Sequence, residues 1–144
     1  MRRGGGKRQA RVIELIARHA IGKPVAGEAL AAHDGFSARY DLDRIAGKFS
    51  RPSHKLAGQS YVGKILVLDT AKGGVASAWM LREMSSRGII PLALVFNSVN
   101  PILAQGAAFG GVTMLAGFQG DITAQVPSGA RVEIDPARRV LRIL

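Results

Sequence analysis

Three short apolar runs in the second half of the chain predict buried β-strands. The runs are KILVL (64–68), PLALVF (91–96) and VTML (112–115). A continuous apolar run is typical of a strand covered on both faces, because a strand with one face in water alternates apolar and polar residues. We therefore expect these three strands to lie inside a sheet with structure packed on both sides.

A helix is predicted between the first two of these strands, over residues 75–87. Ala76 and Met80 lie one helical turn apart and start an apolar face. We expect Trp79 to widen that face and to lie in the core. Gly88 follows as a C′ residue, which predicts the helix end.

The rest of the second half contains a shorter helix and a hairpin. Asn100 and Pro101 fit the N-cap and first position of a helix. ARVEID (130–135) and RVLRIL (139–144) alternate apolar and polar residues, and the DPAR sequence between them predicts a turn.

The first half is less regular. Residues 11–21 contain apolar positions that fit a helix stripe, but their β-branched side chains fit a strand, and we favour the strand. The GKPVAG segment (22–27) predicts a turn and EALAAH (28–33) a second strand. Residues 34–60 are polar and rich in glycine, which predicts a long irregular loop of the kind that often carries function.

The predicted connectivity brings particular side chains to one edge of the sheet. Strands joined by right-handed helical crossovers are parallel, and ligands of open α/β sheets bind at the carboxyl ends of such strands. The loops at 69–74 and 97–100 both leave that edge. We therefore expect seven residues to lie near one another: Thr70, Lys72, Gly73, Gly74, Asn97, Ser98 and Asn100.

The segment DTAKGGVASAWML (69–81) allows two interpretations. Gly73 and Gly74 precede the predicted helix, whose first N–H groups lack internal partners and favour an anion, and Lys72 adds a positive charge. A carboxylate or phosphate site is therefore one interpretation. The other is a glycine turn beside a solvated lysine.

Composition narrows the choice of function. The 144 residues include 47% hydrophobic residues, enough for a core in residues 11–144, which we expect to form one domain after a flexible basic tail at 1–10. The chain has no cysteine, so it cannot supply a thiolate nucleophile, a zinc knuckle or the ligands of an iron–sulfur cluster. No apolar run reaches the ~20 residues that span a bilayer, and we expect a cytoplasmic protein.

The net charge of +10 points to three kinds of partner: nucleic acid, an anionic membrane surface, or an acidic protein or substrate. Arginines and lysines crowd both ends of the chain without interleaved aromatic residues. We interpret these ends as solvated and do not expect nucleic-acid binding from them.

Other motifs in the sequence give weaker signals. GQSYVGKI (58–65) has the spacing of a phosphate loop, but Ile65 replaces the magnesium-binding Ser or Thr and Lys64 opens a strand. The three histidines lack metal-ligand spacing. Asp41 and Asp43 could form a carboxylate pair if their loop is extended, but no further signal supports a site there.

Several stretches resemble one known family. GKPVAGEAL, GQSYVGKILVLDTAKGG and PLALVFNSVNPILAQGA are similar to the small swivel domain of aconitase X-type hydro-lyases, and the loop ending SHKLAGQS corresponds to the family's His-Pro-Leu-x-Gly-x-Ser segment. The resemblance covers roughly residues 18–144. Its most specific part runs from Asn97 to Ala107.

The resemblance implies a swivelling β/β/α domain of the α/β class, with a parallel βαβαβ core, flanking strands and a C-terminal hairpin. It also implies that this chain is the small subunit of a two-chain dehydratase. The large subunit of that family binds the iron–sulfur cluster, and the small subunit closes over the substrate. Reactions of the family are dehydrations of cis-3-hydroxy-L-proline and of phosphomevalonate. We expect a small hydroxy-carboxylate substrate like cis-3-hydroxy-L-proline.

One departure from the family pattern affects the catalytic assignment. The family loop reads Gly-Arg-Gly-Ser, and its serine is the proposed proton acceptor, whereas here Gly74 takes the serine position and Lys72 the arginine position. Ser77 is the one serine left in the loop. The base is therefore Ser77, Thr70 or a group of the other chain. A further alternative is different chemistry.

The expected site residues follow from the loop and the resemblance together. We expect Ser77 and Lys72 in catalytic roles. The expected substrate-binding residues are Gly73, Gly74, Thr70, Asn97, Asn100 and His54. No metal ligand is expected in this chain.

Two other functions remain open from the sequence. A swivel domain that lacks the loop serine could be a non-catalytic interaction module. A basic nucleic-acid-binding domain is the third reading. Without its large subunit, a swivel subunit is expected to expose an apolar docking face and could self-associate.

Overall fold

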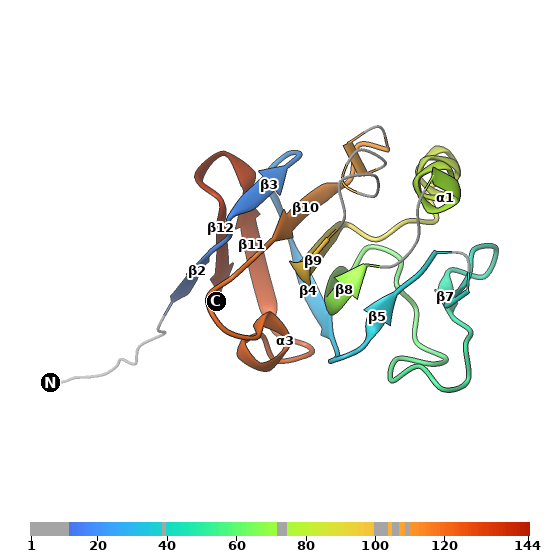
Figure 1. Ribbon diagram of the computed structural model, residues 1–144, viewed down its shortest axis with the longest axis horizontal. Helices are drawn as coiled ribbons and strands as arrows, with labels where there is room; N and C mark the ends of the chain where they lie inside the picture. Colours follow the sequence, from blue (N-terminus) through green and yellow to red (C-terminus); the bar gives the residue numbers. More distant parts are fainter. Residues whose placement is uncertain (1–11, 39, 72–74, 100–103, 105–106, 109) are drawn as a thin grey trace, which may run out of the picture.

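The chain, examined as a computed structural model, folds into a rolled mixed β-sheet with a long helix on its outer face (Figure 1). The structure describes residues 12–38, 40–71, 75–99, 104, 107–108 and 110–144. In chain order the elements are β2 (Ile13–Ile16), β3 (His19–Ile21), β4 (Val25–Ala31), β5 (Gly35–Phe36), β6 (Leu42–Asp43), β7 (Lys48–Phe49), β8 (Ile65–Ala71), α1 (Val75–Ser86), β9 (Ala93–Ser98), β10 (Thr113–Ala116), α3 (Ile122–Gln125), β11 (Arg131–Asp135), η1 (Pro136–Arg138) and β12 (Val140–Ile143).

One half of the sheet is parallel and contains the three strands that the apolar runs predict. β8 pairs in parallel with β9, β9 with β10, and β4 lies parallel on the other side of β8. Helix α1 connects β8 to β9, which confirms the predicted β-α-β arrangement. The helix expected from Asn100 falls mostly outside the described residues, as does the basic tail expected at 1–10.

The other half is antiparallel. β11 pairs with β12 and with β4, and β12 pairs with β2. The predicted C-terminal hairpin is therefore confirmed, and its turn is the η1 segment followed by Arg139 in the left-handed region (φ 57°). Residues 11–21 contain β2 and β3, which confirms the strand interpretation. β4 begins at Val25, so it includes residues that the sequence assigned to a turn.

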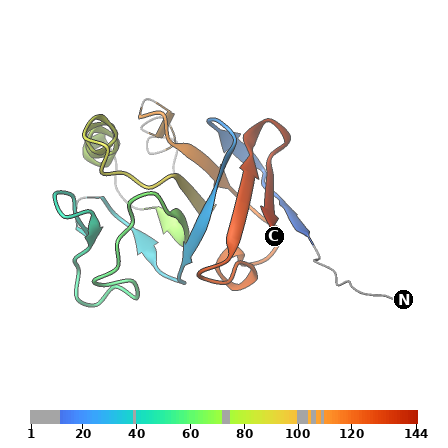
Figure 2. The same cartoon turned by 180° about the vertical axis from the view of Figure 1, so that it is seen from behind.

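The two edge strands of the sheet, β2 and β3, are consecutive in the chain, and this rolls the sheet (Figures 1 and 2). Only Ala17 and Arg18 separate them. The Ala17 N–H donates to the Arg139 carbonyl at 2.8 Å, next to β12, and the Arg18 N–H donates to the Gly117 carbonyl at 2.7 Å, next to β10. These two bonds tie the antiparallel end of the sheet to the parallel end.

The rolled sheet has an apolar core on each face. Along β8, Ile65 and Val67 pack into the core enclosed by the sheet, whereas Leu66 and Leu68 pack into the core beneath α1 and the long loop. All four are fully buried. Since successive strand side chains point to opposite faces, a continuous apolar run is what two covered faces require.

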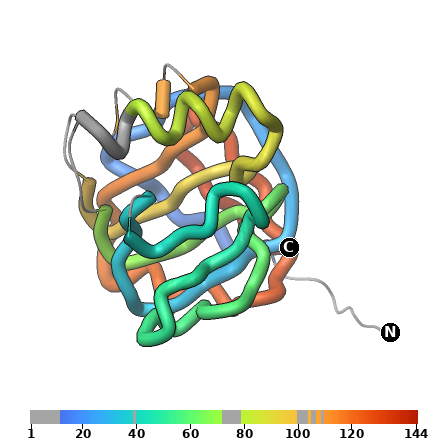
Figure 3. Tube along the Cα trace, turned by 90° about the vertical axis from the view of Figure 1, so that its right-hand side faces the viewer, coloured from blue at the N-terminus to red at the C-terminus, as the bar shows by residue number. Residues whose placement is uncertain are grey.

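Helix α1 lies over the outer core and ends as predicted (Figure 3). The Ile89 N–H bonds to the Met84 carbonyl and the Gly88 N–H to the Ser85 carbonyl, both at 3.1 Å, with Gly88 at φ 71°. This is the pair of bonds that closes a helix at a left-handed glycine. The described elements confirm the predicted α/β class, with more strands than helices.

The prediction that Trp79 lies in the core is wrong. Its side chain is 62% exposed, whereas Leu81 and Met84 are fully buried. With 100° between successive helix residues, Trp79 lies about 160° around the helix from Leu81 and about 140° from Met84. The helix therefore turns the tryptophan to solvent when it buries the other two.

Candidate functional site

The predicted meeting of strand ends is confirmed where the structure describes it. Thr70 near the end of β8 pairs with Ser98 at the end of β9, and their hydroxyl oxygens lie 3.1 Å apart. Both hydroxyls are at the edge of the sheet, and Thr70 lies two residues before Lys72. Thr70 and Ser98 are therefore two residues of the predicted edge site that the structure brings together.

Four of the predicted site residues cannot be placed. Lys72, Gly73, Gly74 and Asn100 lie outside the described residues. Ser77 lies near the start of α1, but its side chain is outside the described part. The roles expected for these five residues remain predictions.

Asn97 belongs to a second network, which we call the edge network, on the opposite face of the sheet from the hydroxyls of Thr70 and Ser98. Its amide nitrogen donates to Asp69 Oδ1 at 2.9 Å and to Asp121 Oδ1 at 2.8 Å. Its amide oxygen accepts the Ile122 N–H at 2.7 Å. Side chains alternate between the two faces of a strand. Asn97 and Asp69 therefore lie on the face of the enclosed core, whereas Thr70 and Ser98 lie on the face of the outer core. Asn97 therefore links β8, β9 and α3, and both of its N–H donors are already used.

Asp121 anchors this network at the start of α3. Its Oδ1 also accepts the Thr123 N–H at 3.0 Å and the Thr123 hydroxyl at 2.7 Å, and its Oδ2 lies 3.3 Å from His33 Nδ1. Hydrogen bonds from Asn97 and Thr123 lower the pKa of Asp121, because they stabilise the ionised carboxylate. The network thus holds an ionised Asp121 at neutral pH.

His54 was expected to bind substrate, but both of its ring nitrogens are bound to the backbone. Nε2 lies 2.8 Å from the Gly35 carbonyl, and Nδ1 accepts the Leu56 N–H at 3.0 Å. Because Nδ1 accepts a hydrogen bond, Nε2 is the ring nitrogen that donates, to the Gly35 carbonyl. The residue is 3% exposed, and its ring stacks on Phe49 with centroids 4.5 Å apart. In this structure His54 therefore ties the long loop to β5 and presents no free nitrogen to a ligand.

A group of charged side chains also fixes the long loop. The guanidinium of Arg51 bonds to buried Asp41 through Nε and lies 3.4 Å from Asp34 through Nη2. The bond to Asp41 raises the pKa of Arg51 above its usual value. Burial raises the pKa of Asp34, but N–H groups of Lys55 and Gly35 outweigh it and leave that pKa below the usual value. The loop that the sequence presents as irregular is thus held by ionised groups.

Asp41 and Asp43 do not form a paired-carboxylate site. Asp41 accepts the Ser37 N–H at 3.0 Å besides its bond to Arg51. Asp43 Oδ1 accepts the N–H groups of the next turn, Ile45 at 3.0 Å and Ala46 at 2.9 Å. Each carboxylate therefore stabilises its own part of the loop.

The described residues contain no group of three or more His, Asp or Glu side chains that could hold a metal ion. The sequence has no cysteine, so the residues of this chain do not fit an iron–sulfur cluster.

The segment with phosphate-loop spacing, residues 58–65, leads into a strand. Lys64 pairs with Glu28 at 3.0 Å and directly precedes β8, as we expected from the sequence.

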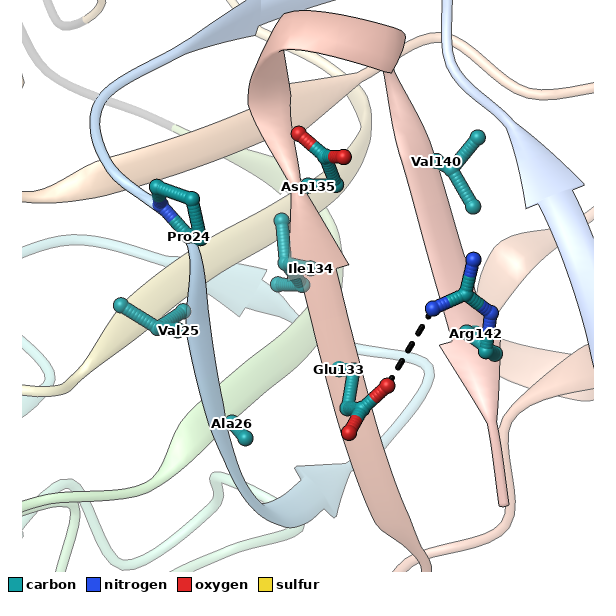
Figure 4. Close-up of a pocket in the computed structure, with 8 residues that line it drawn as sticks. All are labelled: Pro24, Val25, Ala26, Glu133, Ile134, Asp135, Val140 and Arg142. Carbon is teal, nitrogen blue, oxygen red and sulfur yellow. Dashed lines mark hydrogen bonds and ion pairs between the residues drawn. The ribbon is translucent and has the colours of Figure 1, made fainter.

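A shallow pocket lies on the antiparallel half, where β4, β11 and β12 meet (Figure 4). Its one cation, Arg142, bonds to Glu133 at 3.2 Å and to Glu14 at 2.9 Å. Asp135 adds a further carboxylate to the lining. A pocket with its cation already paired twice is poorly suited to an anionic substrate, so the strand ends remain the better candidate.

Sequence reasoning missed three members of the edge network. Asp69 directly follows the apolar run of β8, and that position alone could have indicated it. Asp121 precedes Ile122 and Thr123 as an N-cap, a local signal that was available in the sequence. His33 offered no signal, because its partners Asp121 and Thr123 are distant in the chain.

Comparisons with known proteins agree with this fold. Residues 14–143 match the family model of the aconitase X swivel domain. The phosphomevalonate dehydratase small subunit of Pyrococcus horikoshii is 30% identical over 86% of this chain and 91% of its own length. The protein of the same name from Methanopyrus kandleri is 28% identical over 83% and 89% respectively.

A solved structure shows the same fold. The crystal structure of Thermococcus kodakaraensis aconitase X (holo-form) superposes with a TM-score of 0.84 over 92% of this chain and 98% of that one, at 23% identity. None of the described helices is long and apolar enough to cross a membrane. The resemblance drawn from the residues is confirmed, as is the class of enzyme subunit that it implied, and the chain belongs to the aconitase X swivel domain family.

Proposed function

We propose that this chain is the small subunit of a two-chain dehydratase that removes water from a small anionic hydroxy acid. The observation that carries the proposal is the family match over residues 14–143, together with curated relatives that are named dehydratase small subunits over most of both chains. The alternative, a non-catalytic interaction module, would show no turnover in the test below.

The first substrate to test is phosphomevalonate, the compound in the names of those relatives. The second is cis-3-hydroxy-L-proline, which the sequence resemblance led us to expect. Both carry a carboxylate, and phosphomevalonate adds a phosphate. An anion site at the start of a helix suits either group.

The proposed reaction breaks the C–H bond next to the carboxylate and the C–O bond of the hydroxyl, forms a carbon–carbon double bond and releases water. A positive group near the carboxylate stabilises the charge that develops when the proton leaves. We assign that role to Lys72, supported by the N–H groups of Gly73 and Gly74. Ser77 is the proposed base, with Thr70 as the alternative within this chain.

The pair of hydroxyls on Thr70 and Ser98, which the structure describes, supports this assignment. Thr70 lies two residues before Lys72, and its hydroxyl is 3.1 Å from that of Ser98. Ser98 Oγ donates to Thr70 Oγ1, so the Thr70 hydroxyl keeps its own proton to donate to an anionic group. Asn97 is assigned a different role, because its amide is already bound to Asp69, Asp121 and Ile122. An iron–sulfur cluster, as in the family, would be held by the large subunit.

The test is turnover by the two-chain complex. This chain is produced with its large subunit, purified without oxygen and assayed by ultraviolet absorption for double-bond formation with both substrates. Lys72→Ala and Ser77→Ala should each lower kcat/KM at least tenfold. Ser86→Ala is the matched control, because Ser86 lies at the far end of the same helix and bonds only to the Glu83 carbonyl among the described groups. A stable complex without turnover on any hydroxy acid would contradict the proposal.

A further inference from the structure

Two exposed apolar side chains from separate segments lie on one face around helix α1. Trp79 on the helix is 62% exposed, and Ile45 on the turn after β6 is 78% exposed. The two segments are joined by an ion pair of 3.8 Å between Arg44, next to Ile45, and Glu83, one turn after Trp79. In Figure 1 this turn and the helix lie at the same end of the molecule. We call the face formed by Arg44, Ile45, Trp79, Arg82, Glu83 and Arg87 the Trp79 face.

The Trp79 face is positively charged. The guanidinium of Arg82 lies 5.6 Å from the centroid of the Trp79 ring. Arg87 lies 3.6 Å from Glu83, the same carboxylate that pairs with Arg44. Two of the three guanidinium groups on this face therefore pair with one carboxylate, and the third lies over the indole. Tryptophan and arginine are the residues most enriched at the centres of protein interfaces.

This charge excludes one occupant and favours another. If two copies of the chain met through the Trp79 face, three arginines would face three arginines, which is unfavourable without intervening anions. A protein surface that presents carboxylates around an apolar depression would instead pair with the arginines and cover the indole.

The Trp79 face also continues the candidate site along the same helix. Trp79 lies four residues after Val75, the first residue of α1, so the two positions are on the same side of the helix, about 6 Å apart along its axis. A partner that covers the substrate at the start of α1 therefore reaches the indole without a break. We propose that the Trp79 face docks on an acidic surface of the large subunit, an inference that rests on the proposed function.

A second group of exposed apolar residues provides the internal control. Val12, Ile13 and Ile16 on or beside β2 are 51–56% exposed, and Leu144 is 48% exposed. This group lies at the edge strand of the antiparallel half, and Figure 1 shows β2 and α1 at opposite ends of the molecule. Ile16→Ser thus removes similar apolar exposure from a different face.

The experiment measures the dissociation constant of this chain for the purified large subunit, without oxygen, by calorimetry. Trp79→Ala and Arg82→Glu should each weaken association at least tenfold. Ile16→Ser should stay within threefold of the wild type. Because Trp79 is placed in docking and not in chemistry, kcat at saturating small subunit should be unchanged in Trp79→Ala. The affinity of the wild type should also fall as salt rises.

The possible failures are distinguishable. Unchanged affinity in both Trp79→Ala and Arg82→Glu, or a loss confined to Ile16→Ser, would overturn the docking inference and leave the proposed function intact. A complex that depends on Trp79 but turns over no hydroxy acid would support the docking and overturn the function. Loss of self-association in Trp79→Ala, with large-subunit binding unchanged, would identify a second copy as the occupant. No association between the wild-type chains would refute both.

Discussion

Asn97 offers the sharpest test of the edge network, because one side chain carries three hydrogen bonds. Its amide donates to Asp69 at 2.9 Å and to Asp121 at 2.8 Å and accepts the Ile122 N–H at 2.7 Å. Asn97→Ala removes all three bonds. Asn97→Asp keeps the shape and replaces the shared donor with a third acidic group.

The magnitude follows from the partners. Bonds to the two carboxylates are worth about 1.5–3 kcal/mol each and the bond to the neutral N–H about 1 kcal/mol, so their sum is about 4–7 kcal/mol. Asp121 is half-exposed, with 41% of its side chain accessible, so water recovers part of this loss. We therefore expect Asn97→Ala to lower the free energy of unfolding by about 2–4 kcal/mol.

Asn97→Asp should add a pH dependence that Asn97→Ala lacks. An ionised carboxyl between Asp69 and Asp121 is repelled by both, so its folded-state pKa rises above the unfolded value of about 3.9. The protonated form can still donate to one aspartate and accept the Ile122 N–H. The destabilisation is therefore greatest well above the raised pKa and shrinks as the pH falls through it. His33 lies beside Asp121 in the wild type and in both variants.

The assay is urea unfolding of the full chain followed by circular dichroism, for wild type and both variants, at about pH 8 and about pH 5.5. Ser98→Ala is the control, because it removes one exposed hydroxyl on the neighbouring residue and should cost less than about 1 kcal/mol. An Asn97→Asp deficit that stays the same at both pH values, relative to Asn97→Ala, would refute the network as described. So would an Asn97→Ala cost no larger than that of the control.

Three further predictions test the packing and the loop. The Tyr61 hydroxyl is buried without a partner among the described groups, and burial raises its pKa, so Tyr61→Phe should leave the urea midpoint unchanged or raise it. Gly22 has φ 103°, and a Cβ there would lie 2.6 Å from Thr113 Cα, so Gly22→Ala should lower the melting temperature well below that of Gly58→Ala, where a Cβ meets open space. The pKa of Asp34 is lower in the folded chain than the unfolded value of about 3.9, so its carboxylate stabilises the fold above that value. This stabilisation is lost as the pH falls through the folded pKa. In urea titrations, Asp34→Asn should therefore lose less stability than the wild type between neutral and acid pH.

The second half of the fold could be predicted because its signals are local. The apolar runs of β8, β9 and β10 and the Gly88 helix end each depend on neighbouring residues. The rolling of the sheet could not be predicted, because it depends on bonds from Ala17 and Arg18 to Arg139 and Gly117, which are about a hundred residues away in the chain. Trp79 was misplaced because apolar character alone does not say which side of a helix the core will cover.

The candidate site divides in the same way. The approach of Thr70 to Ser98 followed from strand order alone. The saturation of Asn97 and the backbone bonds of His54 depend on Asp121 and Gly35, whose positions no local pattern reveals. Residue type and loop position therefore indicated chemistry for both side chains, whereas their surroundings assign them to support.

The central claim is that this chain completes an active site that the large subunit alone does not have. The most direct measurement is turnover of phosphomevalonate and cis-3-hydroxy-L-proline by purified large subunit, oxygen excluded, as this chain is added in increasing amounts. The account predicts negligible turnover without the chain, a rise that saturates at one copy per large subunit, and little rise with the Lys72→Ala variant. Equal turnover with and without the chain would contradict it.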